Sequence, residues 1–453
     1  MKKLLLVFLI GVACSATYAQ TFVNRGAPVV VTAGGQMIVV TDGTIGSGSL
    51  ENDATYNGST TGIFKNAGLV VVEGSFVNTT GVANGSGTNT GQYFVKGDWV
   101  NNATFTADQS WVTLYGTNQQ ITGSGQNVFY NLTDSTPIGV GTKTQTNGDV
   151  TVTNSLWLAS SEHATLTNTL LVSNPDPAAI VQNTVNNGFV SSTVGGRLVR
   201  NTNQKAEYIF PTGISNGGNP KIREASVVPA NTQARYYKVR YAEDAPSVTT
   251  TTDDGYDITK KSGSVQSVND VFYHIITASD NASPVDLSIY SDQIADGPWA
   301  SIGSWRGTPS QWESMQDVAF LPGQTGSGRI KFTKGAYTPV VTDTIYALID
   351  TVPIKNDFAF PTAFLPGGVG VPNENTYFTI INQGDIVLLD ELSVFNRWGE
   401  MVFNNKREGT DKWDGHFNGK LQIQGNYVYL AKVRNKQTNK LYPTVTGNVA
   451  LVW

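Results

Sequence analysis

The chain has 453 residues and a formal net charge of −5, with one cysteine, three histidines and only 14% charged residues. One cysteine excludes a disulfide scaffold, an iron–sulfur cluster and a cysteine-based zinc site. The acidic balance argues against a nucleic-acid partner, which would require a basic face. Abundant Gly, Thr and Asn, together with 19 Phe and 18 Tyr, favour strands and turns. The expected fold class is therefore all-β.

Residues 1–19 are predicted to be a signal peptide. Residues 1–3 form a short basic start, and residues 4–12 form an apolar run too short for a bilayer, which needs about 20 residues. Small residues follow, so cleavage is expected between Ala19 and Gln20.

A lipoprotein signal cut before Cys14 is the alternative. Gly11 argues against it, because such signals usually have a large aliphatic residue at that position. No later run of 18 or more apolar residues occurs, so no transmembrane segment is expected in the mature chain.

Residues 20–195 are repetitive. Residues 72–78 and 95–101 share the pattern Val-x-Gly-x-aromatic-Val-Asn at an offset of 23, and residues 152–158 and 166–172 resemble each other at an offset of 14. Each unit is a short strand interrupted by Gly or Asn, which tolerate the backbone conformation of a corner. Strands and corners spaced by about 20 residues predict a β-solenoid. A β-sandwich of similar hairpins is the alternative for this region.

Residues 196–352 are predicted to be a second domain. Alternating strands are expected at 235–241, 271–276, 285–290 and 344–349, with Gly, Pro and Asp turns between them. This pattern predicts an immunoglobulin-like β-sandwich.

After a linker at 353–359, residues 360–453 carry three motifs. They are Phe395-Asn396-Arg397-Trp398-Gly399, Trp413-Asp414-Gly415-x-x-Asn418-Gly419 and Gly425-x-Tyr427-x-Tyr429. In this order the motifs resemble the gliding motility-associated C-terminal domain of Bacteroidetes, the type B sorting domain of the type IX secretion system.

That resemblance implies a small C-terminal β-sandwich and a route of export. Such domains direct proteins from the periplasm through an outer-membrane translocon to the cell surface or the medium. The implied partners are the translocon and its associated sorting or attachment proteins. The family's Asn-Gly-Asp-Gly loop is replaced here by Gly367-Gly368-Val369-Gly370. Because Val369 lacks a carboxylate ligand for a hard cation, no metal is expected in this loop. No cofactor is expected for the chain.

Several side chains of this domain have expected roles. Trp398 and Trp413 are predicted to be core anchors, with Gly399 and Gly415 allowing tight bends beside them. Arg397 is expected to stack on a Trp, to pair with a translocon carboxylate or to form an internal salt bridge.

The remaining expectations concern a turn and the closing strands. Asp414 is expected to bond local backbone. The core of this domain is expected to be closed by alternating residues of the last strands, namely Val428, Leu430, Val449, Leu451 and Trp453.

Candidate catalytic groups are sparse. His163, His274 and His416 fall in three different predicted domains, which disfavours a catalytic triad or a three-His zinc site. Residues 213–217 have the Gly-x-Ser-x-Gly spelling of a nucleophile elbow, but Pro220 follows where a helix should begin.

Acidic pairs and tryptophans offer two further sites. The pairs, which glycosidase chemistry would use, all lie in turn-like sequence: Glu243 with Asp244, Asp253 with Asp254 and Asp257, and Asp390 with Glu391. Trp299, Trp305 and Trp312 form either a sugar-stacking platform or part of a sandwich core.

The sequence therefore favours an exported, non-enzymatic adhesin or structural surface protein without a catalytic residue. A carbohydrate-binding surface protein that uses extracellular glycans is the alternative, followed by a polysaccharide hydrolase.

Overall fold

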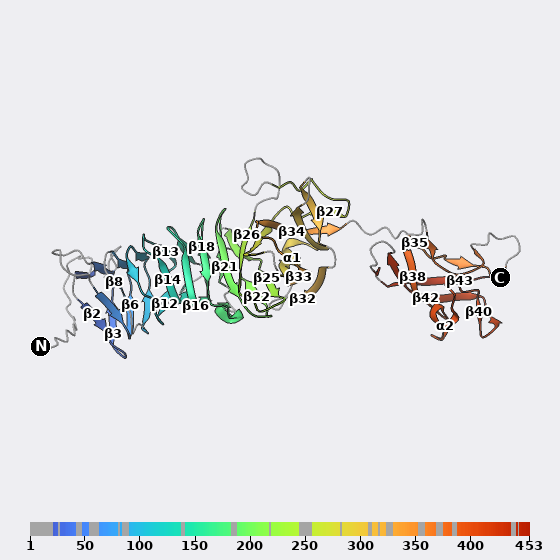
Figure 1. Cartoon of the computed structure of the whole chain (residues 1–453), viewed down its shortest axis with the longest axis horizontal. Helices are drawn as coiled ribbons and strands as arrows, with labels where there is room; N and C mark the ends of the chain where they lie inside the picture. Colours follow the sequence, from blue (N-terminus) through green and yellow to red (C-terminus); the bar gives the residue numbers. More distant parts are fainter. Residues whose placement is uncertain are drawn as a thin grey trace. The chain divides into compact units, whose positions relative to one another are not determined.

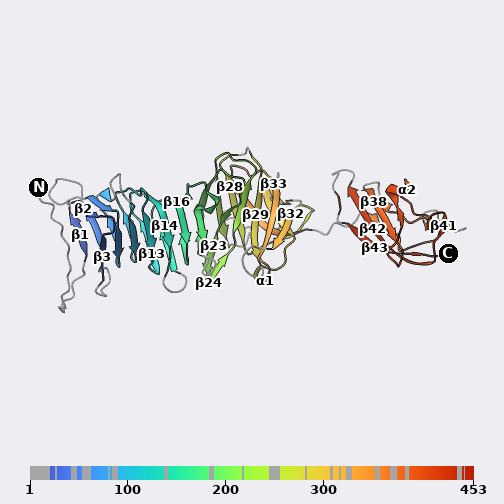
Figure 2. The same ribbon diagram turned by 90° about the horizontal axis from the view of Figure 1, so that it is seen from below.

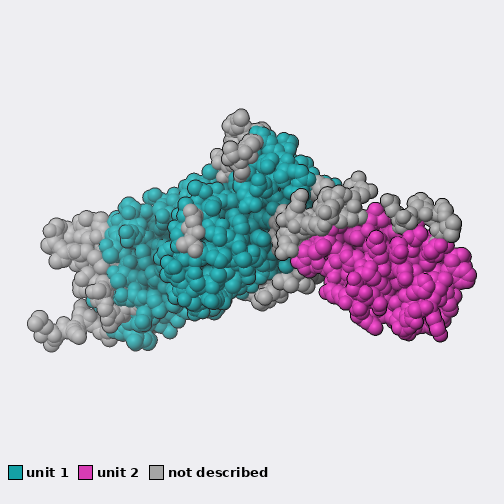
Figure 3. Space-filling view, turned by 45° about the vertical axis from the view of Figure 1, so that its right-hand side comes forward, with its two compact units in different colours: residues 1–352 teal, residues 353–453 magenta. Residues whose placement is uncertain are grey.

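The protein is described from a computed structural model. It describes residues 21–25, 28–41, 48–53, 63–79, 82–83, 90–136, 141–182, 188–216, 219–243, 256–280, 283–306, 310–315, 318–322, 329–351, 358–367, 375–382, 387–435, 441–442 and 444–453. The chain divides into two compact units, Met1–Val352 and Pro353–Trp453 (Figures 1 and 3). With 59% strand and 3% helix, the all-β expectation is confirmed.

The first part of unit 1 is a parallel β-solenoid of about six turns, so the solenoid prediction is confirmed over the sandwich alternative. Its turns stack along the axis of unit 1 (Figure 2). Sheet A contains β1 (Phe22–Arg25), β4 (Leu50–Asp53), β7 (Phe76–Asn78), β10 (Trp99–Asn101), β13 (Asn118–Thr122), β15 (Gly141–Gln145), β17 (Ser161–Ala164) and β20 (Phe189–Ser191).

Two further sheets complete the solenoid. Sheet B contains β2 (Pro28–Val31), β5 (Ile63–Asn66), β8 (Val82–Ala83) and β11 (Thr104–Phe105). The parallel part of sheet C contains β3 (Gln36–Val39), β6 (Leu69–Val72), β9 (Gln92–Val95), β12 (Trp111–Leu114), β14 (Asn127–Asp134), β16 (Val150–Leu158), β18 (Thr169–Val172) and β21 (Arg197–Thr202). The 3-10 helix η1 (Pro177–Ala179) leads into β19 (Ile180–Gln182), which pairs with β16.

Inside the solenoid, side chains of the same type stack on one another in successive turns. Phe76 and Trp99 pair across β7 and β10, are fully buried, and lie in parallel with ring centroids 4.5 Å apart. Beside them runs a ladder of buried asparagines. Its side-chain amides are joined in series, Asn24 to Asn52 at 2.9 Å, Asn52 to Asn78 at 3.1 Å and Asn78 to Asn101 at 2.9 Å.

Sheet C does not end with the solenoid. Its last parallel strand, β21, pairs in parallel with β18 and in antiparallel fashion with β26 (Arg235–Ala242). Because β18 and β21 lie on opposite sides of the boundary predicted at residues 195 and 196, the sheet runs through that boundary. It continues through β28 (Tyr273–Ala278), β34 (Thr344–Thr351), β30 (Ser301–Arg306) and β31 (Gln311–Ser314), with β27 (Val265–Val268) on β34. The four strands expected from the sequence are present as β26, β28, β29 and β34, where β29 is Val285–Asp292.

A second antiparallel sheet faces this extension. Sheet D contains β22 (Tyr208–Phe210), β25 (Ala225–Pro229), β29, β33 (Arg329–Tyr337) and β32 (Val318–Pro322). Residues of both sheets share one hydrophobic core with the solenoid. The hairpin of β23 (Gly213–Asn216) and β24 (Asn219–Ile222) and the short helix α1 (Gln293–Asp296) complete the unit. An immunoglobulin-like topology stays a prediction.

Unit 2 has a hydrophobic core of its own. Its main sheet contains, in spatial order, β36 (Ala363–Phe364), β43 (Val445–Leu451), β42 (Gly425–Asn435), β38 (Val387–Phe395) and β39 (Met401–Asn404). Two small pairs accompany it, β35 (Phe358–Ala359) with β37 (Ile381–Asn382), and β40 (His416–Phe417) with β41 (Lys420–Leu421), besides the helix α2 (Asn405–Glu408).

Candidate functional site

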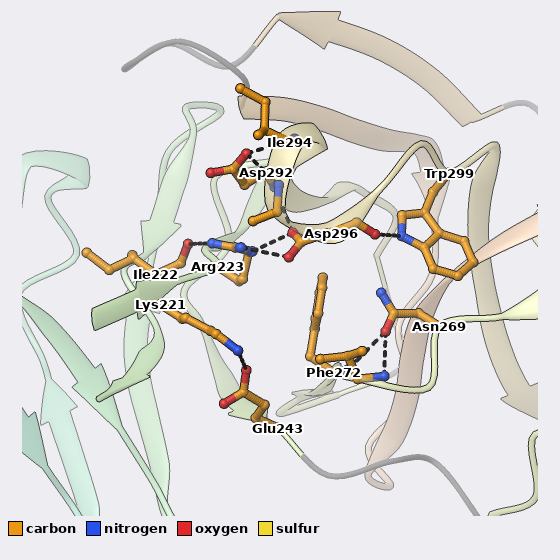
Figure 4. Close-up of polar contacts among 12 residues, drawn as sticks. Lys221, Ile222, Arg223, Glu243, Asn269, Phe272, Asp292, Ile294, Asp296 and Trp299 are labelled. Carbon is orange, nitrogen blue, oxygen red and sulfur yellow. Dashed lines mark hydrogen bonds and ion pairs between the residues drawn. The ribbon is translucent and has the colours of Figure 1, made fainter. Parts of the chain in front are cut away.

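The candidate carboxylates that the structure describes all have partners. Glu243 forms an ion pair with Lys221 (Figure 4). Asp390 pairs with Arg434 at 2.6 Å, and Glu391 pairs with Lys432 at 2.8 Å. Each of these three described acids therefore lies beside a cation.

Of the other acids in the predicted pairs, the structure describes only Asp257. Asp257 accepts hydrogen bonds from the backbone and hydroxyl of Thr259, which lower the pKa of its carboxyl. This is the geometry of an acidic turn. Asp244, Asp253 and Asp254 lie outside the described residues.

A further ion pair, between Arg223 and Asp296, lies near Glu243 and is more deeply buried (Figure 4). Arg223 donates to both oxygens of Asp296 at 2.6 and 2.7 Å, and both side chains are at least nine-tenths buried (Figure 4). Hydrogen bonds and charge from Asp296 outweigh burial and raise the pKa of the guanidinium. By its charge-assisted bidentate geometry, this pair joins α1 to the connection between β24 and β25, where Arg223 lies.

His163 lies inside the solenoid. Its Nδ1 is 2.6 Å from Asp134 Oδ2 and its Nε2 is 2.9 Å from Gln145 Oε1, and all three side chains are fully buried. The Gln145 amide donates to two backbone carbonyls, so Nε2 of His163 is the donor to Gln145. Burial lowers the pKa of the nearby Lys143 to about 8, against the charge of Asp134. The arrangement is an enclosed polar core.

His274 and His416 are separate from this cluster. His274 is fully buried in β28 and donates from Nε2 to the Arg223 carbonyl at 2.9 Å. His416 is exposed, with a side-chain accessibility of 43%. The structure therefore does not bring the three histidines together.

The three candidate tryptophans do not form a common platform. Trp312 is fully buried, so a sugar cannot stack on it. Trp305 is half-buried against Trp312, with ring centroids 5.7 Å apart. Trp299 is half-buried, and its indole donates to the Asp296 carbonyl at 2.9 Å (Figure 4). Trp312 is therefore a core residue.

In unit 2, the first motif forms a tight turn between β38 and β39. The Gly399 amide donates to the Asn396 carbonyl at 2.9 Å, and the backbone of Gly399 has a φ of 81°. The buried Asn396 side chain accepts from the amides of Trp398 and Glu400, both at 3.0 Å, and donates to the Glu400 carboxylate at 2.9 Å. Phe395, half-buried, ends the preceding strand. The turn is fixed by its own side chains.

The prediction that Trp398 is a core anchor is wrong. Its side chain is 73% exposed, because residues 397 and 398 occupy the two central positions of the turn. The Arg397 guanidinium lies over the Trp398 ring, 5.3 Å from its centroid. Of the three expectations for Arg397, the structure shows the stacking.

Trp413 is the core anchor of unit 2. It is fully buried, its indole donates to the His416 carbonyl at 3.0 Å, and its ring meets that of Tyr427 at 5.0 Å. Asp414 accepts from the His416 amide at 2.9 Å, so the expected local backbone bond is confirmed. A Cβ on Gly415 would lie 2.6 Å from the Pro366 side chain, so the position requires glycine.

Asn418 and Gly419 form the two-residue turn between β40 and β41. Both have positive φ, 51° and 73°, as a tight hairpin turn of the I′ type requires. Gly425 begins β42, where a Cβ would lie 3.1 Å from Arg397 Nη2.

The expected alternation of the closing strands is correct for β43 but out of phase for β42. Val449 and Leu451 are fully buried, whereas Val428 is 49% and Trp453 64% exposed. In β42 the core residues are Tyr427, Tyr429, Ala431 and Val433. A shift by one residue moves every side chain to the other face of a strand, and the large tyrosines take the inner face.

Comparison with known families decides the nature of this unit. Residues 363–446 match the family model of the CHU_C type IX secretion signal domain. Unit 2 carries a type IX secretion signal domain. The search of curated proteins gave no match, and the search of solved structures gave none.

The secretion signal domain implies export to the cell surface or the extracellular medium and an interaction with the type IX secretion machinery. The resemblance of the C-terminal motifs to this family is thereby confirmed. No helix among the described residues is long and apolar enough to span a membrane.

The two turns of the secretion signal domain, at residues 396–399 and 418–419, were not predicted from the motifs, although the sequence contains a signal for each. Asn at the first and Gly at the fourth position of a turn is a common pattern, and it would have placed Trp398 at the tip. The dipeptide Asn418-Gly419 is likewise a strong hairpin signal.

Other sequence expectations fall on segments that are not described. The cleavage site at Ala19 and Gln20 and the loop around Val369 lie outside the described residues. Within the described ranges, no group of three or more His, Cys, Asp or Glu side chains is placed to hold a metal ion.

Proposed function

We propose that this protein is a non-enzymatic adhesin or structural protein, delivered to the cell surface or the medium through its secretion signal domain. The observation that supports it most is the continuity of sheet C from β3 to β31. One hydrogen-bonded sheet and one hydrophobic core join the solenoid to the antiparallel part of unit 1. Such a unit is a stiff support for presenting a surface.

The state of the acidic side chains also supports a role without catalysis. Glu243, Asp296, Asp390 and Glu391 each pair with a Lys or Arg. A catalytic acid would need a raised pKa, whereas Lys432 lowers the pKa of the Glu391 carboxyl.

An adhesion assay tests the proposal. Type IX-competent cells would express either the full chain or a chain in which residues 21–352 are replaced by an inert reporter. Cells with the full chain should attach to neighbouring cells or to glycan-coated and uncoated surfaces, and cells with the reporter should not. Equal attachment by the two strains would contradict the proposal. Polysaccharide hydrolysis by the purified protein, lost on Glu243→Gln or Asp390→Asn, would replace it with the hydrolase alternative.

Carbohydrate binding is the second candidate, and one pocket favours it. A hollow of about 460 Å³ is lined by the ion pair of Arg306 and Glu313, by Lys334 and Tyr337, and by three serines and Met315. Charged groups, hydroxyls and one aromatic ring are what a sugar site uses. None of the three candidate tryptophans lines it.

A glycan array distinguishes carbohydrate binding from an adhesive function that uses no sugar ligand. Binding that disappears on Tyr337→Ala or Arg306→Ala, but persists on Trp305→Ala, would place the sugar in this pocket. Loss on Trp305→Ala alone would instead support the tryptophan site expected from the sequence.

A further inference from the structure

We infer that Arg397 and Trp398 are the contact by which the type IX machinery recognises the secretion signal domain. The partner surface they fit is a carboxylate beside an apolar or aromatic pocket. The inference rests on delivery by that machinery and is independent of what unit 1 binds.

Trp398 does not belong to the described core of unit 2. It is 73% exposed, and the core of unit 2 is built from other aromatics, among them Trp413, Phe364 and Tyr429. A large exposed indole gives little to folding, because its apolar area stays in water. At protein interfaces, in contrast, Trp and Arg are the side chains that most often dominate binding.

The turn is built to hold this pair in place. Asn396 fixes three backbone and side-chain groups of the turn through hydrogen bonds of 2.9 to 3.0 Å. Gly425 on the adjacent strand leaves the space that the guanidinium occupies. A fixed turn loses little conformational freedom when it binds, which raises affinity.

The charge of Arg397 is available to a partner. No ion pair joins it to a carboxylate of the described residues, whereas Lys432 and Arg434 in the same domain are both paired. Burial raises the pKa of Tyr427, and the Arg397 charge opposes that rise. An arginine stacked on Trp keeps its planar fork open for bidentate pairing with a carboxylate.

The surroundings extend the contact with further apolar area. Phe395 is paired with the exposed Val428, and Gly425 is paired with Leu451. Ile423, 63% exposed, and Trp453, 64% exposed, lie two residues beyond that second pair, at the same end of the sheet. The strand register thus places further exposed apolar side chains at the end of the sheet where Arg397 and Trp398 lie, and exposed apolar area is a feature of interaction surfaces.

The test uses the full chain in a type IX-competent host, with an isogenic strain that lacks the translocon as the reference for blocked export. The variants are Trp398→Ala and Arg397→Glu. The matched control is Lys412→Ala, because Lys412 lies over the exposed Tyr377 ring at 5.7 Å elsewhere in the same domain. Immunoblots measure the ratio of chain in the medium and on intact cells to chain in the periplasm.

We expect each variant to lower that ratio about tenfold or more, as loss of a Trp or Arg interface anchor does, and the control to export normally. Melting temperatures of the purified chains should agree within about 2 °C, since the changed residues are exposed. If Trp398→Ala melts lower, Arg397→Glu decides, because it leaves the indole and the Asn396 bonds intact.

Normal export of both variants would overturn the inference. Retention of the unaltered chain at the level of the translocon-lacking strain would instead refute the delivery route. The two failures are therefore distinguishable.

Discussion

At the scale of single residues, His274 makes the fold sensitive to acid. Its Nδ1 is buried without a hydrogen-bond partner in the described structure, so protonation would bury an unpaired charge. Burial first, and the Arg223 charge in addition, lower the pKa of His274 from 6.5 to about 4. Between these values the unfolded chain binds a proton that the folded chain does not, and stability falls as the pH falls through this window.

Urea unfolding between pH 4.5 and 7 measures this effect. His274→Gln should reduce the dependence of the unfolding free energy on pH by up to about 1.4 kcal/mol per unit. His416→Gln, at an exposed site, should leave the slope as it is. An unchanged slope in the His274 variant would contradict the assignment.

The buried pair of His163 and Asp134 should matter for stability at neutral pH. Replacing His163 by Leu leaves the Asp134 carboxylate buried without its partner at 2.6 Å. Leaving a buried polar group without its hydrogen-bond partner destabilises a protein by about 1 to 3 kcal/mol. The same change at the exposed His416 should cost less than about 0.5 kcal/mol. Chemical unfolding followed by far-UV circular dichroism compares the two, and equal losses would show that the contact between His163 and Asp134 does not stabilise the solenoid.

Some side-chain environments can be predicted from the sequence, and others depend on the fold around the residue. The Asp414 backbone bond and the buried Trp413 are predictable, because each depends on near neighbours or on size and polarity. The exposure of Trp398 is not set by its own chemistry, since it follows from the turn that Asn396 and Gly399 form around it.

At the scale of elements, the asparagine ladder joins successive turns of the solenoid. Asn78→Ala would remove the acceptor of Asn52 and the donor to Asn101 and to the Thr104 carbonyl. Leaving buried polar groups unpaired should lower the unfolding free energy by about 2 to 4 kcal/mol.

The matched control is Asn147→Ala, which removes one exposed bond to the Gly123 carbonyl and should change stability by less than about 0.5 kcal/mol. Urea unfolding of the full chain measures both. A loss for Asn78→Ala no larger than that of the control would show that the ladder does not stabilise the solenoid.

Of the two repeat offsets seen in the sequence, one matches the pairing of strands between turns and the other does not. The offset of 23 is correct, because Phe76 pairs with Trp99 and Asn78 with Asn101 in adjacent strands. A Cβ on Gly97 would lie 2.4 Å from the Gly74 carbonyl carbon, so the glycine of this repeat is required by the stacking.

The offset of 14 is wrong as a structural repeat. Val152 pairs with Val172, 20 residues on, and Leu166 lies at a corner with a φ of 53°. The two segments are similar in residue type, but one lies within the single strand β16 and the other spans a corner and β18. Pairing between turns, which only the folded chain defines, decides the register.

At the scale of the whole molecule, the two units have separate cores and should unfold separately. Deleting residues 445–453 removes β43, which lies between β36 and β42 in the main sheet of unit 2, together with the buried Val449 and Leu451. An interior strand cannot be lost without disrupting the sheet.

Scanning calorimetry of the full and truncated chains tests this independence. The truncated chain should lose the transition of unit 2, keep that of unit 1 and fail to leave the periplasm. Loss of both transitions would show that unit 1 depends on unit 2.

The antiparallel pairing of β26 on β21 ends the parallel part of sheet C. This pairing does not depend on how many turns precede it, since each turn contacts its neighbours through the same lateral bonds. A duplication or loss of one whole turn therefore changes the length of the solenoid by one strand spacing, about 4.8 Å, and leaves the end structure intact. The number of turns therefore sets the length of the solenoid in equal steps, without any change to the strands that follow it.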